Sequence, residues 1–150
     1  MKVFVNTTSN EDEMRVEILC RQITGEVRDL ERYIRNYDGK LIAHAGEEMA
    51  RVSVRDILYI EAVDNNVFLY TQSGVYETDR KLYELETLLS ARDFFRCGKS
   101  LIVNIYHIRA LRPEITRNIR VTMDNDEILY ISRRYAKAFK ERIAGGAEHE

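Results

Sequence analysis

The sequence has few of the residues on which disulfide-stabilised domains, flexible linkers and membrane spans depend. It contains two cysteines, Cys20 and Cys97, which lie far apart, and a single proline, Pro113. The absence of a C-x-x-C pair excludes a disulfide scaffold and a zinc site of recognisable spacing, and two lone cysteines are typical of a reducing cytoplasm. No apolar run approaches the ~20 residues that cross a bilayer, and residues 1–6 include no apolar stretch of signal-peptide length. We therefore expect a cytoplasmic protein.

Motifs of nucleotide-binding and hydrolytic enzymes are also missing. No G-x-S-x-G, G-x-x-x-x-G-K-[ST] or G-x-G-x-x-G occurs in the sequence. Basic Arg96 and Lys99 near Cys97 would lower a thiol pKa, but no partner histidine motif accompanies them, and we interpret His107 as a strand or turn residue. Residues 124–127 resemble part of a calcium loop without its glycine and final carboxylate, which favours a hairpin turn. We expect no enzyme activity, cofactor, metal or small-molecule substrate.

Charge is distributed unevenly, although the formal net charge is only −2. Residues 94–123 contain six Lys or Arg and one Glu, whereas acidic residues gather at 11–13 and 148–150. Local charge decides whether a polyanion can dock, because salt screens interactions beyond about 8–10 Å. The basic stretch is therefore either an ordinary solvated surface or, if polar loops lie beside it, a docking surface for a polyanion.

The first part of the chain, up to about residue 45, is predicted to be a small strand–helix–strand extension. Apolar and polar residues alternate over 14–20, which is the period of a half-buried strand. The turn signal Asp38–Gly39 precedes a second short strand at 40–44. Residues 2–7 are a further candidate strand.

Three helices are predicted from apolar residues at helical spacing. Thr24 is a suitable N-cap for the first helix, Thr78 or Asp79 for a second helix over 80–89, and the third covers 133–143 and ends at Gly145–Gly146. The residues expected on their buried faces are Val27, Leu30, Tyr33 and Ile34; Leu82, Leu85, Leu88 and Leu89; and Tyr135, Phe139 and Ile143.

From residue 46 onward, short strands at regular spacing predict a mainly β domain of small packed antiparallel sheets. Runs rich in β-forming residues end at the turn segments 64–66, 72–74 and 124–126. We expect Ile108 and Leu111 to point inward, and we expect four tyrosines to pack in the core or on a sheet surface rather than stack on bases: Tyr59, Tyr70, Tyr76 and Tyr130. The predicted strand segments are 57–61, 67–71, 75–78, 94–96, 101–104, 105–111, 119–123 and 127–131.

Several short segments then occur in a characteristic order over some ninety residues. They are 56–62, 65–67, 82–86, 94–104, Ile108, Leu111 and 131–135. In this order and spacing, residues 52 to about 143 resemble the LytTR family of bacterial DNA-binding domains. The resemblance implies short strands in small packed sheets with little helix. It also implies that loops, not a recognition helix, enter successive major grooves on one face of DNA, usually from two subunits on direct repeats.

Carried over residue by residue, the resemblance implies DNA contacts from two turns. The first is Asn65–Asn66, where Asn66 is expected to bond an adenine edge. The alternative is that the two asparagines merely permit positive φ in a turn. The second is Lys99–Ser100, where Lys99 reaches guanine or a phosphate and Ser100 bonds a phosphate oxygen, unless this is a simple solvated loop.

The third implied segment is 132–134, at the start of the last predicted helix. A helix N-terminus offers free N–H groups to a phosphate, and an arginine there can bond guanine through two donors. Arg134 matches the family's base-contacting position, and Arg133 is expected to contact a phosphate or a structural partner. The supporting positions are Ser132, Arg80, Lys81 and Lys137.

The chain departs from the commonest architecture of this family. Most members carry a receiver domain of more than a hundred residues, and only about fifty residues precede the resemblance here. We therefore do not expect phosphorylation control. The extension resembles that of free-standing members, which are regulated by partners, often small membrane proteins. The predicted organisation is an extension over 1–45, a LytTR-type domain over 46–144 and a flexible tail over 145–150.

Two hypotheses of different classes follow. The first is a transcriptional regulator that binds duplex DNA as a weak or DNA-induced homodimer. The second is a protein-interaction module that blocks a related regulator by forming mixed dimers through the extension. Structured RNA is a poorer ligand because the A-form major groove is too narrow for side chains. The first hypothesis requires Asn66, Lys99 and Arg134 to lie on a common side of the β-scaffold.

Overall fold

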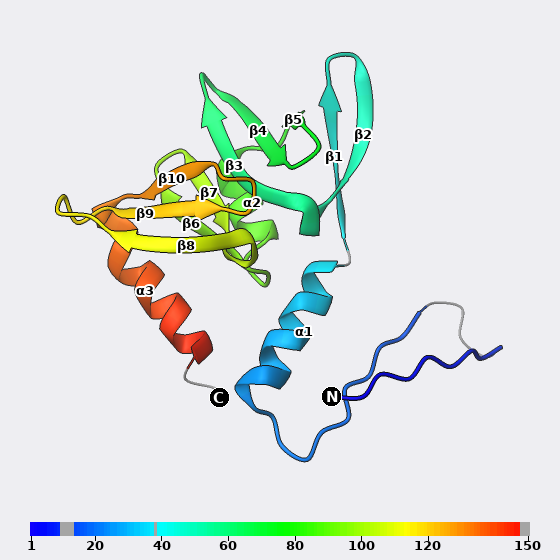
Figure 1. Ribbon diagram of the computed structural model, residues 1–150. Coiled ribbons are helices and arrows are strands. Elements are labelled where there is room, and N and C mark those ends of the chain that lie inside the picture. The colour runs from blue at the N-terminus through cyan, green and yellow to red at the C-terminus, as the bar shows by residue number, and fades with distance from the viewer. Residues whose placement is uncertain (10–13, 38, 148–150) are drawn as a thin grey trace.

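Two antiparallel sheets form the body of the protein in the computed structural model, which describes residues 1–9, 14–37 and 39–147 (Figure 1). The first sheet has the order β2-β1-β5-β4-β3-β7-β6 and the second β10-β9-β8. The mainly β class expected from the sequence is confirmed. The strands of the first sheet are β1 (Lys40–Ala45), β2 (Glu48–Ser53), β3 (Ile57–Val63), β4 (Asn66–Thr71), β5 (Val75–Thr78), β6 (Phe94–Gly98) and β7 (Leu101–Asn104).

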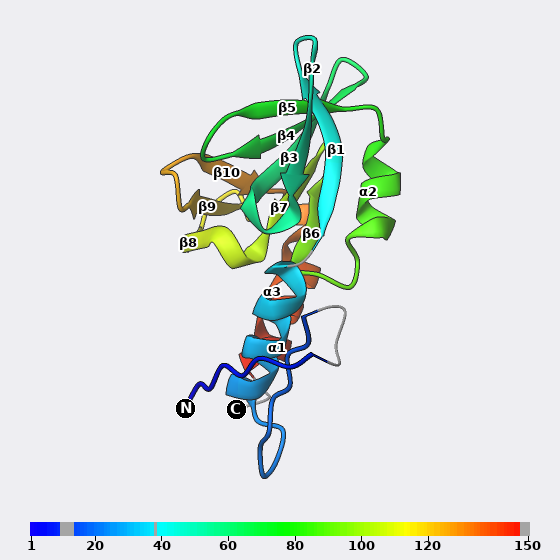
Figure 2. The ribbon, with the colours of Figure 1, turned by 90° about the vertical axis from the view of Figure 1, so that its right-hand side faces the viewer.

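The second sheet and the helices complete the described chain. The strands are β8 (Ile108–Pro113), β9 (Ile119–Met123) and β10 (Ile128–Ile131); the helices are α1 (Gly25–Tyr37), α2 (Leu82–Leu88) and α3 (Arg133–Ala147), with short 3₁₀ turns η1 (Val54–Asp56) and η2 (Ile105–His107). Helices α1 and α3 both extend away from the sheets at the end opposite the β3–β4 turn (Figures 1 and 2).

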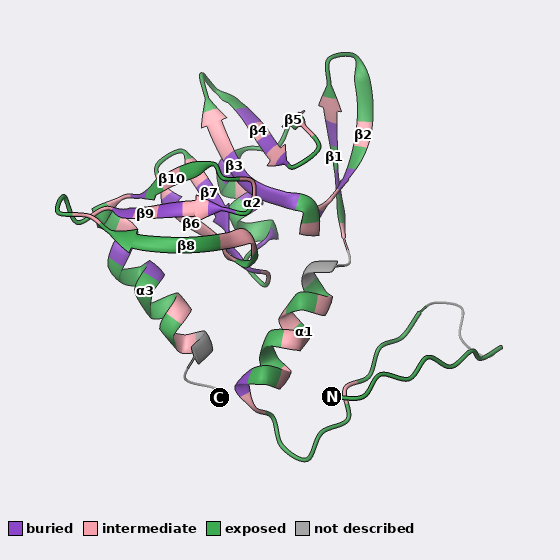
Figure 3. Cartoon of the chain, in the orientation of Figure 1, coloured by how far each residue is buried: buried purple, intermediate pink, exposed green. Residues whose placement is uncertain are grey.

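Strand β3 lies between two hydrophobic cores: residues 57–60 are buried, and the strand becomes more exposed toward its end at the β3–β4 turn (Figure 3). Ile57 and Ile60 pack into a core with α2, whereas Leu58 and Tyr59 pack into a second core with β9 and α3. A register shift between residues 57 and 59 interrupts the alternation of faces at this point. Each fully buried aliphatic side chain contributes about 1.5–3 kcal/mol to the free energy of folding. Because β3 supplies such side chains to both cores, it joins them into one folded unit.

A buried asparagine links β7 to β3. Asn104 is fully buried, and its Nδ2 donates to the carbonyl of Ile57 at 2.8 Å, while its Oδ1 accepts from the N–H of Tyr106 at 3.1 Å. Buried polar groups are expensive to leave unpaired, and both ends of this amide are paired. The side chain therefore fixes the position of β7 relative to β3.

The predicted strand at 14–20 is not formed, nor is the candidate strand at 2–7. Among the described residues neither segment is part of a sheet, and Met14 and Val16 are exposed. The helix prediction is confirmed: Thr24 caps α1 by accepting from the N–H of Val27 at 3.4 Å. The predicted turn residue Asp38 lies outside the described residues.

Strand β1 is longer by one residue than predicted, and β2 was not predicted at all. The two strands pair along their whole length, from Lys40 with Ser53 to Ala45 with Glu48, across a turn where Gly46 has a φ of +64°. Strand β1 therefore belongs to the same sheet as β3 and β4, although it precedes residue 46. The domain boundaries near residues 45 and 144 stay predictions.

Five local predictions about helices and facing are wrong. Tyr33 of α1 and Leu88 of α2, expected on buried faces, are 44% and 48% exposed, because they lie at the edges of the apolar stripes that face the sheets. Helix α2 begins after Lys81, whose N–H donates to the Glu84 carboxylate at 3.1 Å, so neither Thr78 nor Asp79 is its N-cap. Helix α3 continues through Gly145 to Ala147, where the glycines were expected to end it. Leu111 is 44% exposed on the edge strand β8, where both faces of residues 109–113 are exposed to solvent.

Candidate nucleic-acid interface

The two asparagines of the β3–β4 turn have different roles. Asp64 and Asn65 have φ values of 50° and 68°, the left-handed pair that a two-residue hairpin turn requires. Asn66 is the first residue of β4 and pairs with Val63, and it is exposed. Asn65 therefore has the role of permitting positive φ in the turn, which was considered for both asparagines. The side chain of Asn66 is exposed to solvent.

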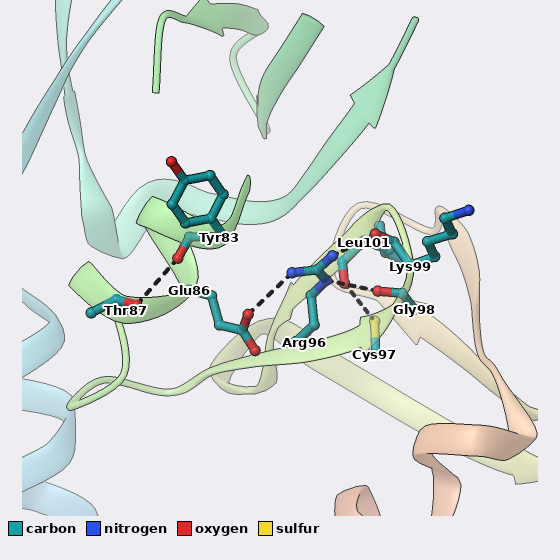
Figure 4. Close-up of polar contacts among 8 residues, drawn as sticks. All are labelled: Tyr83, Glu86, Thr87, Arg96, Cys97, Gly98, Lys99 and Leu101. Carbon is teal, nitrogen blue, oxygen red and sulfur yellow. Dashed lines mark hydrogen bonds and ion pairs between the residues drawn. The ribbon is translucent and has the colours of Figure 1, made fainter. Parts of the chain in front are cut away.

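The β6–β7 turn is positioned by an arginine that sequence reasoning assigned only to the basic surround. The Arg96 guanidinium donates to the carbonyls of Gly98 at 2.8 Å and Lys99 at 2.5 Å, and pairs with Glu86 of α2 at 3.1 Å (Figure 4). Lys99 and Ser100 are exposed, and Figure 4 shows the Lys99 side chain directed away from this cluster. Arg96 fixes the turn, so Lys99 remains the cation presented to solvent.

The start of α3 is capped from a distant loop. The Asn118 Oδ1 accepts from the N–H of Arg133 at 2.9 Å, which satisfies one of the donors left free at a helix N-terminus. Arg133 and Arg134 are exposed. Ser132 is half-buried, and its carbonyl accepts from the N–H of Tyr135 at 2.9 Å. The sequence offered no local signal for Asn118, because the cap lies fifteen residues away from the N–H that it binds.

Two backbone hydrogen bonds connect these three segments. The N–H of Ala62 donates to the carbonyl of Ser100 at 2.9 Å, and the N–H of Ser132 donates to the carbonyl of Cys97 at 3.1 Å. In Figure 1 the β3–β4 turn and the start of α3 lie on the left side of the molecule, with the β6–β7 turn between them. We call residues 64–66, 99–100 and 132–134 the loop edge. The structure thus brings Asn66, Lys99 and Arg134 to one side, as the DNA-binding hypothesis requires.

Further cations flank the loop edge. Strand β5 ends at Thr78 opposite Val67, so the exposed Arg80 and Lys81 follow at the same end of the sheet as the β3–β4 turn. Lys137 lies on α3 and lines an open groove between this helix and the β8–β9 loop. The charged residues that line this groove are Arg117, Arg133, Lys137, Lys140, Glu114 and Glu141. Positive side chains predominate there, as a phosphate-facing surface requires.

The ionisable groups beneath the edge have structural roles. Burial raises the pKa of the Cys97 thiol to about 12, and this outweighs the opposing effect of Arg96. The suggested lowering of this pKa by its basic neighbours is therefore wrong, since burial disfavours the thiolate. His107 bonds the Asp124 carboxylate at 3.0 Å and the Arg55 carbonyl at 2.5 Å, which supports its interpretation as a structural residue.

Tyr59 and Tyr70 stack on each other within the first sheet, with ring centroids 4.3 Å apart. Burial, reinforced by the charge of Glu127, raises the pKa of Tyr59 to about 12. Tyr59 is buried and Tyr70 and Tyr76 are half-buried, as expected for sheet packing, whereas Tyr130 is exposed on β10. In the part of the chain that the structure describes, no three metal-binding side chains gather, and no helix has the length and apolarity needed to cross a membrane.

Comparison with known proteins is consistent with this geometry. Residues 47–144 match the family model of the LytTr DNA-binding domain. An uncharacterized HTH-type transcriptional regulator of Staphylococcus aureus strain NCTC 8325 is 30% identical over 146 residues, which cover 96% of this chain and 97% of that protein. A relative described in the same words from strain MRSA252 is 29% identical over the same coverage. The similarity therefore includes the residues that precede the matched domain.

A solved structure shares the fold. The LytTr DNA-binding domain of a Bacillus cereus protein described as a methyl-accepting/DNA response regulator superposes with a TM-score of 0.66 at 28% identity, covering 69% of this chain and 95% of that one. Among the described residues no two helices are joined by the short turn of a helix-turn-helix, since strands separate α1, α2 and α3. The mainly β architecture, the loop edge and the family match agree, and the chain belongs to the LytTR family of DNA-binding domains.

Proposed function

We propose that this protein is a transcriptional regulator that binds duplex DNA sequence-specifically by inserting the loop edge into successive major grooves. The observation that carries the proposal is the pair of backbone hydrogen bonds, Ala62 to Ser100 and Ser132 to Cys97, which join three polar segments into one edge. A rigid backbone beneath exposed side chains lowers the entropy lost on binding. The regulator names of the Staphylococcus aureus relatives support the same class of function.

Each segment has a chemistry suited to a different contact. Asn66 can bond adenine through its amide, and Arg134 can bond guanine through two parallel N–H groups. Lys99 reaches either guanine or a phosphate, and Ser100 and Arg133 suit phosphate oxygens. Base contacts would set the sequence preference, while phosphate contacts would supply most of the affinity. The remaining phosphate candidates are Asn65, Arg80, Lys81, Ser132 and Lys137.

The sheet geometry sets the spacing of the first two base contacts. Strands β4 and β6 are separated by β3 and β7, which is three strand spacings of about 4.8 Å each. The Asn66 and Lys99 turns are therefore about 10–14 Å apart, which corresponds to about three to four base pairs at 3.4 Å per pair. This separation is compatible with one major groove of ~12 Å width.

We further propose that two subunits bind direct repeats, that the protein acts in the cytoplasm and that no catalytic step is involved. Regulation by a small membrane-protein partner remains part of this proposal. The alternative is an interaction module that forms mixed dimers with a related regulator. The two functions differ in whether the purified chain itself selects a DNA sequence.

Selection of bound fragments from random duplexes, followed by a salt titration on the recovered site, tests the proposal. We expect a direct-repeat consensus, and with roughly five phosphate contacts per subunit, log K should fall with log salt at a slope of about −4 to −5. Absence of sequence enrichment, together with a stable complex between this chain and a related regulator, would favour the alternative and contradict DNA recognition by the loop edge.

A further inference from the structure

In the part of the chain that the structure describes, three of the four edge strands are protected from pairing with another chain. The edges are β2 and β6 in the first sheet and β10 and β8 in the second. Strands β6 and β8 each contain a register shift, β8 ends in Pro113, and β10 is only four residues long. Irregular register, proline and short length are common means of keeping an edge from pairing.

Strand β2 is the edge that lacks these features. It pairs with β1 over six residues without a register shift, and it contains no proline, glycine or lysine. Met49 in β2 is 71% exposed, and Ile42 in the neighbouring strand is 66% exposed. A regular, partly apolar edge of this length is a template for pairing with a further strand.

The hydrogen-bond pattern of the β1–β2 ladder indicates which backbone groups of β2 face outward. The N–H of Val54 donates to the carbonyl of Gly39 at 3.0 Å, which continues the β1–β2 register by one residue. Hydrogen-bonded and non-hydrogen-bonded pairs alternate along an antiparallel ladder. Met49 and Arg51 therefore occupy non-hydrogen-bonded positions relative to β1, and their N–H and C=O groups point toward the free edge.

Charge favours one register for two copies of β2. An antiparallel pair in which Met49 faces Met49 of the other copy places Arg51 opposite Glu47, the exposed residue that precedes the strand. A pair centred on Arg51 would place two arginines directly opposite each other, which is destabilising. A pair centred on Ala50 would place Arg51 opposite Met49. The register centred on Met49 thus joins the outward backbone groups and sets opposite charges against each other.

We propose that β2 pairs with β2 of a second copy of this chain, antiparallel and centred on Met49, so that the first sheets of the two copies become one continuous sheet. Such an interface uses the same patch on both copies. Backbone hydrogen bonds supply the affinity, and the side chains fix the register. Few residues take part, so we expect weak and reversible association. The inference does not rest on the proposed function, because no residue of the loop edge takes part.

This pairing leaves the loop edge free. In Figure 1, β2 lies at the upper right of the molecule, and the loop edge lies on the left. Because the two copies share one sheet, a two-fold axis relates their loop edges, whereas direct repeats require two domains in the same orientation. The β2 dimer therefore joins subunits that occupy separate DNA sites, and the two subunits on adjacent repeats each keep a free β2 edge.

Sedimentation equilibrium of the full chain without DNA measures the association. We expect a reversible dimer, and we expect Met49→Glu to weaken it at least about tenfold, because two carboxylates then lie opposite each other. Ile115→Glu is the matched control, since Ile115 is also exposed but lies between β8 and β9, and it should leave the dimer unchanged. A parent chain that stays monomeric at ~100 μM, or a dimer that Met49→Glu does not weaken, would overturn the proposal.

Amide hydrogen exchange measured by NMR distinguishes edge pairing from other modes of self-association. The N–H groups of Met49 and Arg51 should exchange slowly only at concentrations at which the dimer forms, because the second copy supplies their acceptors. The N–H of Ala50 points toward β1 and should be protected at every concentration, which makes it an internal control. A dimer that forms without protecting Met49 and Arg51 would overturn the proposal.

Charge reversal tests the register. Glu47→Arg and Arg51→Glu should each weaken self-association about tenfold, because each single change puts like charges opposite each other. An equimolar mixture of the two variants should form a heterodimer, in which opposite charges face each other again. A mixture that stays monomeric while the parent dimerises would overturn the proposed register. Each variant should bind a single recovered half-site as the parent does, which separates failure of this inference from failure of DNA binding.

Discussion

The loop edge and residues 1–24 both expose their side chains, but they differ in what supports the backbone. At the loop edge, Ala62 and Ser132 donate backbone hydrogen bonds to neighbouring hairpins, and Arg96 binds the carbonyls of the β6–β7 turn. Residues 14–24 form neither helix nor strand. Exposed polar groups on a fixed backbone suit recognition of a rigid ligand such as duplex DNA, whereas the exposed apolar side chains before α1 suit contact with another chain.

The two cysteines give the largest expected difference between the regions. Cys20 is exposed in the first 24 residues, whereas Cys97 is fully buried in β6 with its pKa raised to about 12 by burial. At pH 8 we expect iodoacetamide to modify Cys20 at least about a thousand times faster, because Cys97 reacts only when the fold opens. Mass spectrometry of peptides from a time course measures both rates. Equal rates would show that β6 is not held in place.

Loosening the scaffold should affect stability more than any change at its surface. Asn104→Ala leaves the Ile57 carbonyl and the Tyr106 N–H without their partner, and we expect it to lower the free energy of unfolding by about 3 kcal/mol. Asn125→Ala removes one bond in the β9–β10 turn, to the N–H of Glu127, and should cost under about 1 kcal/mol. Urea unfolding of both variants makes the comparison, and similar losses would contradict the role given to Asn104.

Removing the arginine at the start of α3 should weaken DNA binding without affecting the fold. Arg134→Ala is expected to cost about 1–3 kcal/mol of binding free energy to the selected site, measured by fluorescence anisotropy. Arg28→Ala removes an exposed arginine from α1, away from the loop edge, and should leave affinity almost unchanged. Equal losses in both variants would indicate general electrostatic attraction rather than a specific contact at Arg134.

Asn118 should influence DNA binding only through the position of α3. Asn118→Ala removes the acceptor for the Arg133 N–H, and we expect it to lower stability by about 1 kcal/mol and to weaken preference at the base that Arg134 contacts. Asn118→Asp keeps an acceptor and should preserve both properties. A loss of stability with unchanged base preference would mean that the cap supports the fold alone.

The stability of the fold should not change near neutral pH and should fall progressively at alkaline pH. The folded-state pKa values of Cys97 and Tyr59 are both raised to about 12, from ordinary values of 9.0 and 10.0. Groups with raised folded pKa values bind protons more tightly when folded, so their contribution is complete below about pH 9 and falls as pH rises toward 12. Thermal unfolding between pH 7 and 11 measures this, and Cys97→Ala should flatten the decline. An unfolding temperature that increases as the pH is raised beyond 9 would contradict this prediction.

The amino-acid sequence was sufficient to predict an element where the pattern and the residues that it pairs with lie close together in the sequence. Strands β3, β4 and β5 were predicted because β-forming runs end at Asn or Gly turns, and Thr24 caps α1 as expected. It was insufficient where a partner lies elsewhere. The alternation over 14–20 favours a strand, but these residues are not part of either sheet among the described residues.

The candidate site shows the same division. Asn66, Lys99 and Arg134 were predicted from the resemblance to the LytTR family, and the structure places their segments on one side. Arg96 and Asn118 position the turns through contacts with backbone atoms, which no spacing in the sequence indicates. Burial of Cys97 likewise depends on the packing of two sheets and α3, so the direction of its pKa shift could not be predicted from neighbouring charges.

The most direct test compares the base preferences of Asn66→Ala, Lys99→Ala and Arg134→Ala with the parent, by selection from one library of random duplexes. We predict that each variant loses preference at its own position within a half-site, with the Asn66 and Lys99 positions about three to four base pairs apart. Three variants that retain the parental consensus, or lose all positions together, would contradict recognition of DNA by the loop edge.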